Sequence, residues 1–107
     1  MLPDLNIGTA GGSSAHPSVT DAVAAAAART PADITLAVNG RFQGGYITRR
    51  YGRPLQNVHA VQLELAQKQY MREEPPYDWI DERAQRLQPV LRDMVTSALR
   101  ACEALHA

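Results

Sequence analysis

Residues 58–65, VHAVQLEL, form the clearest strand in this sequence. Apolar and polar side chains alternate along the second half of the stretch, which is the pattern of a strand with one face against a core. Because side chains point alternately to opposite faces, Gln62 and Glu64 share one face and Leu63 lies on the other. The stretch therefore predicts a sheet strand that presents two polar side chains on the same side.

The sequence before this strand predicts a sheet combined with helices. Residues 34–38, ITLAV, are short, apolar and β-branched, and they read as a buried strand. Residues 2–7 give a weaker extended segment, and an alanine-rich helix runs from Pro17 toward Arg29, where Thr30-Pro31 stops it. Strand, helix and strand in this order are typical of parallel strands joined by a crossover. We therefore expect an α/β fold with mainly parallel strands.

The last third of the chain predicts a long amphipathic helix that begins near Asp78. Apolar residues recur there at steps of three and four, as on one buried helical stripe. Pro89 lies inside this pattern and removes one backbone hydrogen bond, so we expect a kink or a split near Gln85. By contrast, residues 40–54 are rich in glycine and arginine and irregular in pattern, and we expect a structured loop there.

Composition excludes several classes of function. Eleven Lys+Arg balance eleven Asp+Glu, so no overall field attracts nucleic acid or anionic lipid. No apolar run approaches the roughly 20 residues of a membrane-spanning helix. The single cysteine, Cys102, cannot form an internal disulfide, and no signal peptide opens the chain, which together favour the cytoplasm. We expect neither nucleic acid nor membrane as a partner.

Glu64 is the first candidate for chemistry, because it lies near the C-terminal end of a predicted strand, where ligands of open α/β sheets gather. A carboxylate in an apolar strand is also costly to bury unless it is paired or used. An acid/base role and an ion pair with an arginine of residues 40–54 explain it equally well. Those arginines suit carboxylate ligands, and Tyr46 can either orient a ligand or pack the loop. The three histidines are widely separated and show no metal-binding spacing, so we assign no metal ligand.

Three blocks of the sequence resemble the N-formylglutamate amidohydrolase family, also called N-formylglutamate deformylases. The blocks are residues 2–12 (LPDLNIGTAGG), 39–54 (NGRFQGGYITRRYGRP) and 58–71 (VHAVQLELAQKQYM), followed by RLQPVL in the long helix. The resemblance spans essentially the whole chain but only about the last two-fifths of a typical member. It implies that residues 1–107 are the C-terminal part of a single amidohydrolase domain.

The resemblance also implies a fold, a reaction and roles for particular residues. The family fold is a three-layer α/β/α arrangement similar to zinc carboxypeptidases, of which this chain would be a part. The family hydrolyses N-formyl-L-glutamate to formate and L-glutamate in histidine degradation, and it uses a divalent metal, zinc by this resemblance, whose ligands lie outside this chain. By analogy, Glu64 is the general acid/base, with Gln62 beside it on the same face as a substrate-binding residue. Arg49 and then Arg41 hold the carboxylates of a small acidic N-acyl amino acid, and Tyr46 also belongs to the expected substrate-binding residues.

The resemblance is to a family of metal-dependent enzymes, but this chain alone is expected to be inactive. Whether the chain is to be counted as an enzyme therefore stays open. Two alternatives remain: a non-catalytic binder of a small dicarboxylate, and a helical module that pairs with a partner. An exposed sheet edge would also favour self-association of the isolated chain.

Overall fold

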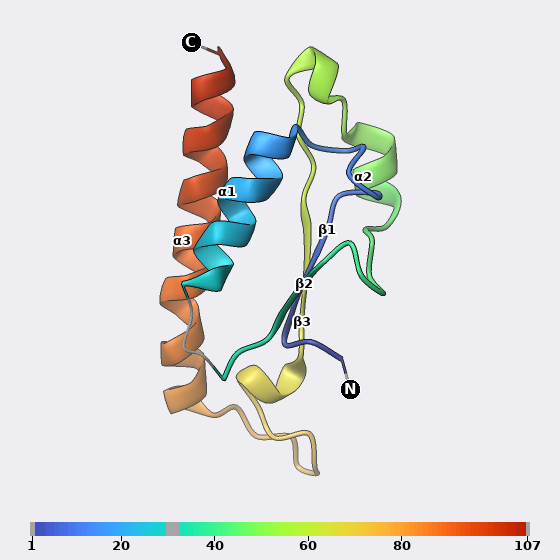
Figure 1. Ribbon diagram of the computed structural model, residues 1–107. Coiled ribbons are helices and arrows are strands. Elements are labelled where there is room, and N and C mark those ends of the chain that lie inside the picture. Colours follow the sequence, from blue (N-terminus) through green and yellow to red (C-terminus); the bar gives the residue numbers. More distant parts are fainter. Residues whose placement is uncertain (1, 30–32, 107) are drawn as a thin grey trace.

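The computed structural model describes residues 2–29 and 33–106. It contains a small sheet, three helices and two short 3-10 turns, which we label η1 and η2 (Figure 1). Thr30 and Pro31, which the sequence predicts to stop the first helix, lie outside the described residues. The elements are β1 (Leu5–Gly8), α1 (Pro17–Ala28), β2 (Leu36–Val38), α2 (Tyr46–Tyr51), η1 (Pro54–Gln56), β3 (Gln62–Leu65), η2 (Gln67–Gln69) and α3 (Asp81–His106).

The sheet has the strand order β2-β1-β3. β1 and β2 are parallel, whereas β1 and β3 are antiparallel, so the expectation of mainly parallel strands is not confirmed. The chain passes from β1 through α1 to β2, which is the crossover connection expected for two parallel strands. The connection from β2 to β3 contains only α2 and η1 and returns the chain alongside β1 in the opposite direction. An alternating sequence predicts a strand but carries no information on its direction.

The core lies between one face of the sheet and two helices. Figure 1 shows α1 and α3 side by side on this face, with the short helix α2 on the other side of the sheet. Leu5 and Ile7 of β1 are fully buried against both helices because every second side chain of the strand points to them. A six-residue α2 is not a second helical layer, so the structure shows an α/β fold but not the three-layer arrangement. The other buried core residues are Val23, Ala26, Ala27, Ile34, Leu87, Val90 and Met94.

The long C-terminal helix is confirmed, but it runs unbroken through Pro89 and begins three residues later than predicted, at Asp81. Its apolar side chains on both sides of the proline are buried in the same core, Leu87 before it and Met94 after it. Packing on this continuous stripe outweighs the one backbone hydrogen bond that proline cannot make. No helix of the described residues is both long and apolar enough to cross a membrane.

The strand predicted over residues 58–65 is shorter in the structure, because only Gln62–Leu65 pairs with β1. Val58 forms an isolated bridge with Arg53, and Ala60 donates its N–H to the carbonyl oxygen of Ser14 at 2.9 Å. Residues 58–61 therefore lie against the loop before α1 and do not pair with β1. Within the segment predicted as a loop, residues 40–54, the structure places the helix α2.

β3 forms one border of the sheet, since its only described strand partner is β1. Beside it, an apolar groove of about 400 Å³ runs between β3 and α3. It is lined by Leu63 of β3, by Val61 just before this strand, and by Met94 and the exposed Val95 of α3. An unpaired strand edge next to apolar surface favours association with further polypeptide. Self-association through this edge stays a prediction.

Asp4 links the residue before β1 to Thr35 and Lys68, and its carboxylate makes the stability of the fold depend on pH. Its carboxylate accepts the backbone N–H of Thr35 at 3.0 Å and lies 3.3 Å from the Lys68 ammonium. Burial by itself raises the pKa of Asp4, but the hydrogen bond from Thr35 and the charge of Lys68 together lower this pKa below its usual value. A lowered folded-state pKa stabilises the fold above the unfolded-state pKa, and this contribution is lost as the pH falls through the folded-state value.

Asp4→Asn is therefore expected to lower the free energy of unfolding by about 1–3 kcal/mol at pH 7, since the carboxylate's charge-assisted hydrogen bonds are lost. The difference from the unchanged chain should shrink below about pH 4, where the unfolded carboxyl is protonated. Urea unfolding followed by circular dichroism at pH 7 and pH 3 measures both values. Asp21→Asn, at an exposed position of α1, is the matched control. An equal difference at the two pH values would contradict the role of the carboxylate charge.

Candidate functional site

The side chain of Gln62 joins β3 to the beginning of α2. Its Oε1 atom accepts the backbone N–H of Gly45 at 2.7 Å, and its Nε2 atom donates to Oε1 of Glu64 at 2.9 Å. Gly45 is the residue that precedes α2. Both ends of the amide are therefore used, and this orients the Glu64 carboxylate relative to the loop before α2.

This loop rests directly on the end of β1, where Gly8 pairs with Gln62 in the sheet register. A Cβ atom added at Gly8 would overlap the backbone nitrogen of Gly44 and the carbonyl carbon of Gln43. The backbone N–H of Ala10 also donates to the Gln43 carbonyl oxygen at 2.6 Å. The absence of a side chain at Gly8 thus permits the contact that places α2 beside β3.

The helix α2 contains Arg49, one of the predicted arginines, and Arg49 belongs to the same network. Thr48 is almost completely buried and donates its hydroxyl to the carbonyl oxygen of Gly45 at 2.7 Å, which anchors the first turn of the helix. Arg49 donates from Nη1 to the carbonyl oxygen of Gly44 at 3.3 Å, and its side chain is otherwise exposed. Glu64, Gln62 and Arg49 therefore belong to one hydrogen-bonded chain that passes through Gly44 and Gly45.

Two other predicted residues do not join this network. Arg41 is exposed and forms no ion pair within the described ranges. Tyr46, the first residue of α2, has 64% of its surface exposed, so it does not pack the loop onto the sheet. Both side chains are free to meet a ligand.

The structure corrects two of the reasons for selecting Glu64. First, its side chain is exposed, so no burial cost marks it as functional. Second, β3 is antiparallel to β1, so Glu64 does not lie where β1 and β2 end; it pairs with Asn6 in the middle of the sheet. The alternative ion pair with a loop arginine does not form in the described part of the chain, where Gln62 is the hydrogen-bond partner instead.

Asn6 is a polar neighbour of Glu64 that the sequence analysis did not select. It lies on the same face of the sheet, is 4% exposed, and donates from Nδ2 to the carbonyl oxygen of Pro3 at 2.8 Å. Its Oδ1 atom is buried without a partner in the described residues. The sequence contained a signal for this residue, since Asn6 is the single amide in the apolar strand LNIG. A buried amide side chain needs a hydrogen-bond partner, and this requirement singles it out.

A cavity of about 510 Å³ lies next to Gln62, between α2 and the segment that leads to β3. Its wall is largely apolar and includes Thr48 and His59. Burial, together with the nearby His16, holds the pKa of His59 below its usual value. The Nδ1 atom of His59 accepts the backbone N–H of His16 at 3.0 Å, which also favours the neutral ring. This cavity provides an open, largely apolar space beside the polar network.

The described residues do not fit a divalent metal ion by themselves. Nowhere in residues 2–29 and 33–106 do three or more His, Cys, Asp or Glu side chains come together in a group that could hold one. Glu64 is the carboxylate of the network, and a single carboxylate does not make a zinc site.

Comparisons with known proteins agree on one family. The family model for N-formylglutamate amidohydrolase matches residues 1–71. The chain is 46% identical to an N-formylglutamate deformylase of Pseudomonas aeruginosa over 101 residues and 42% identical to one of Pseudomonas putida over 98 residues. Each alignment covers 92% of this chain but 36% of the relative.

A solved structure shows the same arrangement of elements. The crystal structure of an N-formylglutamate amidohydrolase from Ralstonia eutropha JMP134 matches with a TM-score of 0.73 at 24% sequence identity. The match covers 98% of this chain and 35% of that chain. This chain therefore spans about a third of the length of its relatives, and it belongs to the N-formylglutamate amidohydrolase family.

Proposed function

We propose that this chain supplies part of the active site of an enzyme that hydrolyses N-formyl-L-glutamate to formate and L-glutamate. Two relatives that share 42–46% of its residues are named for deformylation of N-formylglutamate. The observation that supports the proposal is the hydrogen-bonded chain from Glu64 through Gln62 to the backbone N–H of Gly45, at the beginning of the helix that contains Arg49.

Glu64 is the proposed general acid/base of this reaction. Hydrolysis of a formamide needs a proton removed from the attacking water as its oxygen bonds to the formyl carbon, and a proton delivered to the nitrogen as the C–N bond breaks. An exposed carboxylate with one oxygen held by Gln62 can accept the first proton and return it to the departing amine. Gln62 acts as a positioning residue, since its amide fixes the carboxylate without touching the reacting atoms.

The arginines are the proposed binding groups for the two carboxylates of the substrate. A guanidinium group matches a carboxylate with two parallel N–H donors, and Arg49 uses only one of its donors, toward Gly44. Arg41 is the second choice and has no competing ion pair among the described residues. Tyr46 begins α2 one residue from the N–H that Gln62 accepts, so its exposed hydroxyl can orient the same ligand.

The divalent cation that the family resemblance implies, zinc, belongs in this proposal to polypeptide that this chain does not contain. The relatives are nearly three times longer than the matched segment, so they have room for the ligands and for the second helical layer of an α/β/α fold. The groove beside β3 is the natural place for such polypeptide to pack. The soluble assembly, its compartment and its substrate preference all depend on that larger protein.

A chimera tests the proposal directly. The P. aeruginosa deformylase is prepared with its matching segment replaced by this chain, and formate release from N-formyl-L-glutamate is measured in buffer with zinc. The chimera is expected to release formate at a rate within about tenfold of the parent enzyme, because this chain is 46% identical to the segment that it replaces. The 107-residue chain alone is expected to release none above the buffer rate.

Thermal unfolding and zinc content of the chimera serve as controls for folding. A folded, zinc-containing chimera that releases no formate would overturn the proposed substrate. Formate release by the isolated chain at the rate of the parent enzyme would overturn the proposal that its site is partial.

A further inference from the structure

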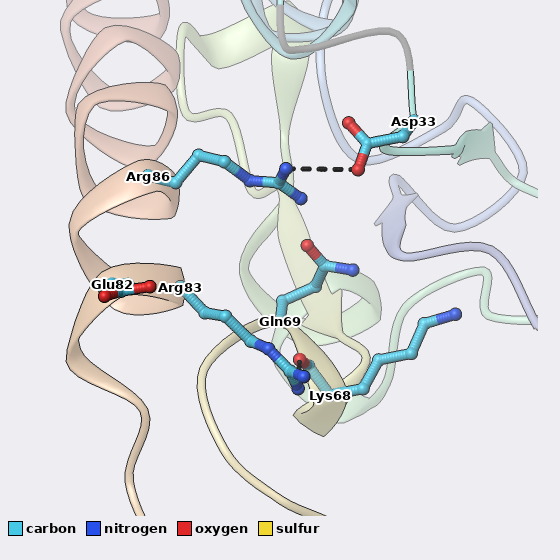
Figure 2. Close-up of a pocket in the computed structure, with 6 residues that line it drawn as sticks. All are labelled: Asp33, Lys68, Gln69, Glu82, Arg83 and Arg86. Atoms are coloured by element: carbon cyan, nitrogen blue, oxygen red, sulfur yellow. Dashed lines mark hydrogen bonds and ion pairs between the residues drawn. The ribbon is translucent and has the colours of Figure 1, made fainter.

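A second cavity, of about 480 Å³, lies at the other end of the sheet from Gln62, where β3 leads into η2 (Figure 2). Residues of η2 form one wall and the first turns of α3 form the other. Three cationic side chains and two carboxylates line it together with one amide. The lining residues are Asp33, Lys68, Gln69, Glu82, Arg83 and Arg86. None of them belongs to the network around Glu64.

Two arginines of α3 reach toward this cavity from the same face of the helix. Arg83 and Arg86 are three residues apart, a spacing that makes side chains neighbours on a helix surface. Each is held by one contact: Arg83 donates from Nη1 to the carbonyl oxygen of Lys68 at 3.0 Å, and Arg86 pairs with Asp33 at 3.1 Å. A guanidinium group has five N–H donors, so most donors of both side chains remain free for a ligand.

Lys68 contributes to the opposite wall, but its ammonium group turns away from the arginines. It lies 3.3 Å from the buried Asp4, whose carboxylate also accepts from Thr35, and 43% of the lysine side chain is exposed. Figure 2 shows the ends of Arg83 and Arg86 on two sides of the Gln69 amide, whereas the Lys68 side chain extends away from them.

Gln69 places a side-chain amide in this space. The residue is 9% exposed, and its backbone N–H is used by the carbonyl oxygen of Ala66 at 3.0 Å. Its side-chain amide has no hydrogen-bond partner among the residues that the structure describes, and Figure 2 shows it directed into the cavity between Lys68 and Arg86. The amide donors and acceptor of Gln69 therefore face the cavity, where they can meet a bound group.

We propose that this cavity is a binding site for a small doubly charged oxyanion, either inorganic phosphate or a short dicarboxylate. The guanidinium groups of Arg83 and Arg86 match the paired oxygens of both anions, and the Gln69 amide donates a neutral hydrogen bond that fixes the orientation of the anion. Asp33 and Glu82 reduce the net charge of the lining to a single positive charge, three cations less two carboxylates, so binding depends on directed hydrogen bonds.

The site can be tested on the 107-residue chain by NMR titration. Inorganic phosphate and succinate are titrated separately at constant ionic strength, and a sodium chloride series of the same ionic strength is the reference. Saturable shifts of the Gln69 side-chain amide and of the Arg83 and Arg86 amides are expected with at least one of the two anions. Saturation by phosphate alone assigns a phosphate site, and saturation by succinate alone assigns a dicarboxylate site.

Single substitutions separate this site from general attraction to arginine. Arg83→Gln and Arg86→Gln are each expected to weaken binding at least fivefold, whereas Arg100→Gln, at an exposed position near the other end of α3, should leave it unchanged. Gln69→Leu keeps the buried volume and removes the amide, so it should weaken binding while the melting temperature is retained. Linear shifts that sodium chloride reproduces, or equal weakening by Arg100→Gln, would overturn the proposal.

Discussion

Replacing Glu64 by Gln in the chimera is expected to lower kcat for formate release by about 10²- to 10⁴-fold, the usual range for a general acid/base. The amide keeps the size of the side chain and can still meet Gln62, but it cannot carry a proton between water and amine. KM should change little, because the role proposed for Glu64 is at the reacting atoms and not at the substrate carboxylates. Initial rates over a range of N-formyl-L-glutamate concentrations separate the two parameters.

Glu103→Gln is the matched control for this experiment. It makes the same chemical change on an exposed residue near the end of α3, far along the chain from the network. Its kcat should equal that of the unaltered chimera. A loss of less than threefold in Glu64→Gln would show that the carboxylate does not transfer the proton.

Replacing Gly8 by Ala is expected to lower the free energy of unfolding of this chain by about 1–3 kcal/mol, the usual cost of forcing an extra group into a packed region. The added methyl group would overlap backbone atoms of Gln43 and Gly44, which cannot move as a side chain does. The loop must therefore shift away from β1. This shift also moves the N–H of Gly45 away from the Gln62 amide that accepts it. In the chimera the same change should also lower kcat at least tenfold, since Gln62 no longer holds Glu64 in place.

Gly40→Ala is the control for this substitution, because a Cβ atom there meets only the Cβ atom of Ala37 at an ordinary 3.4 Å. Urea unfolding of the isolated chain and formate release by the chimera measure the two effects. Unchanged stability in Gly8→Ala would show that the loop does not rest on β1 as described.

The fold was predictable where local patterns and packing agree. The apolar stripe of α3, the proline that opens α1 and the short apolar run of β2 each specify an element by its own periodicity or termini. The direction of β3 was not predictable, because alternation is the same in parallel and antiparallel strands. The continuity of α3 at Pro89 was not predictable either, since the core that holds Leu87 and Met94 together depends on the tertiary structure.

The candidate site was predictable in its residue types and not in its geometry. The alternation in residues 58–65 placed Gln62 and Glu64 on one face, and the hydrogen bond between them confirms this. No pattern in the sequence could show that Gln62 would reach the N–H of Gly45, because that contact depends on Gly8 admitting the loop. The roles of Glu64, Arg49, Arg41 and Tyr46 in the reaction stay predictions.

The central claim is that the carboxylate of Glu64 and the guanidinium group of Arg49 serve one pocket. Its most direct test is the dependence of formate release on N-formyl-L-glutamate concentration in the chimera with Arg49→Gln, compared with Arg100→Gln. Loss of a charge-assisted contact with a substrate carboxylate should raise KM about 10- to 100-fold in Arg49→Gln and leave Arg100→Gln unchanged. A KM and kcat in Arg49→Gln equal to those of the control would contradict the claim.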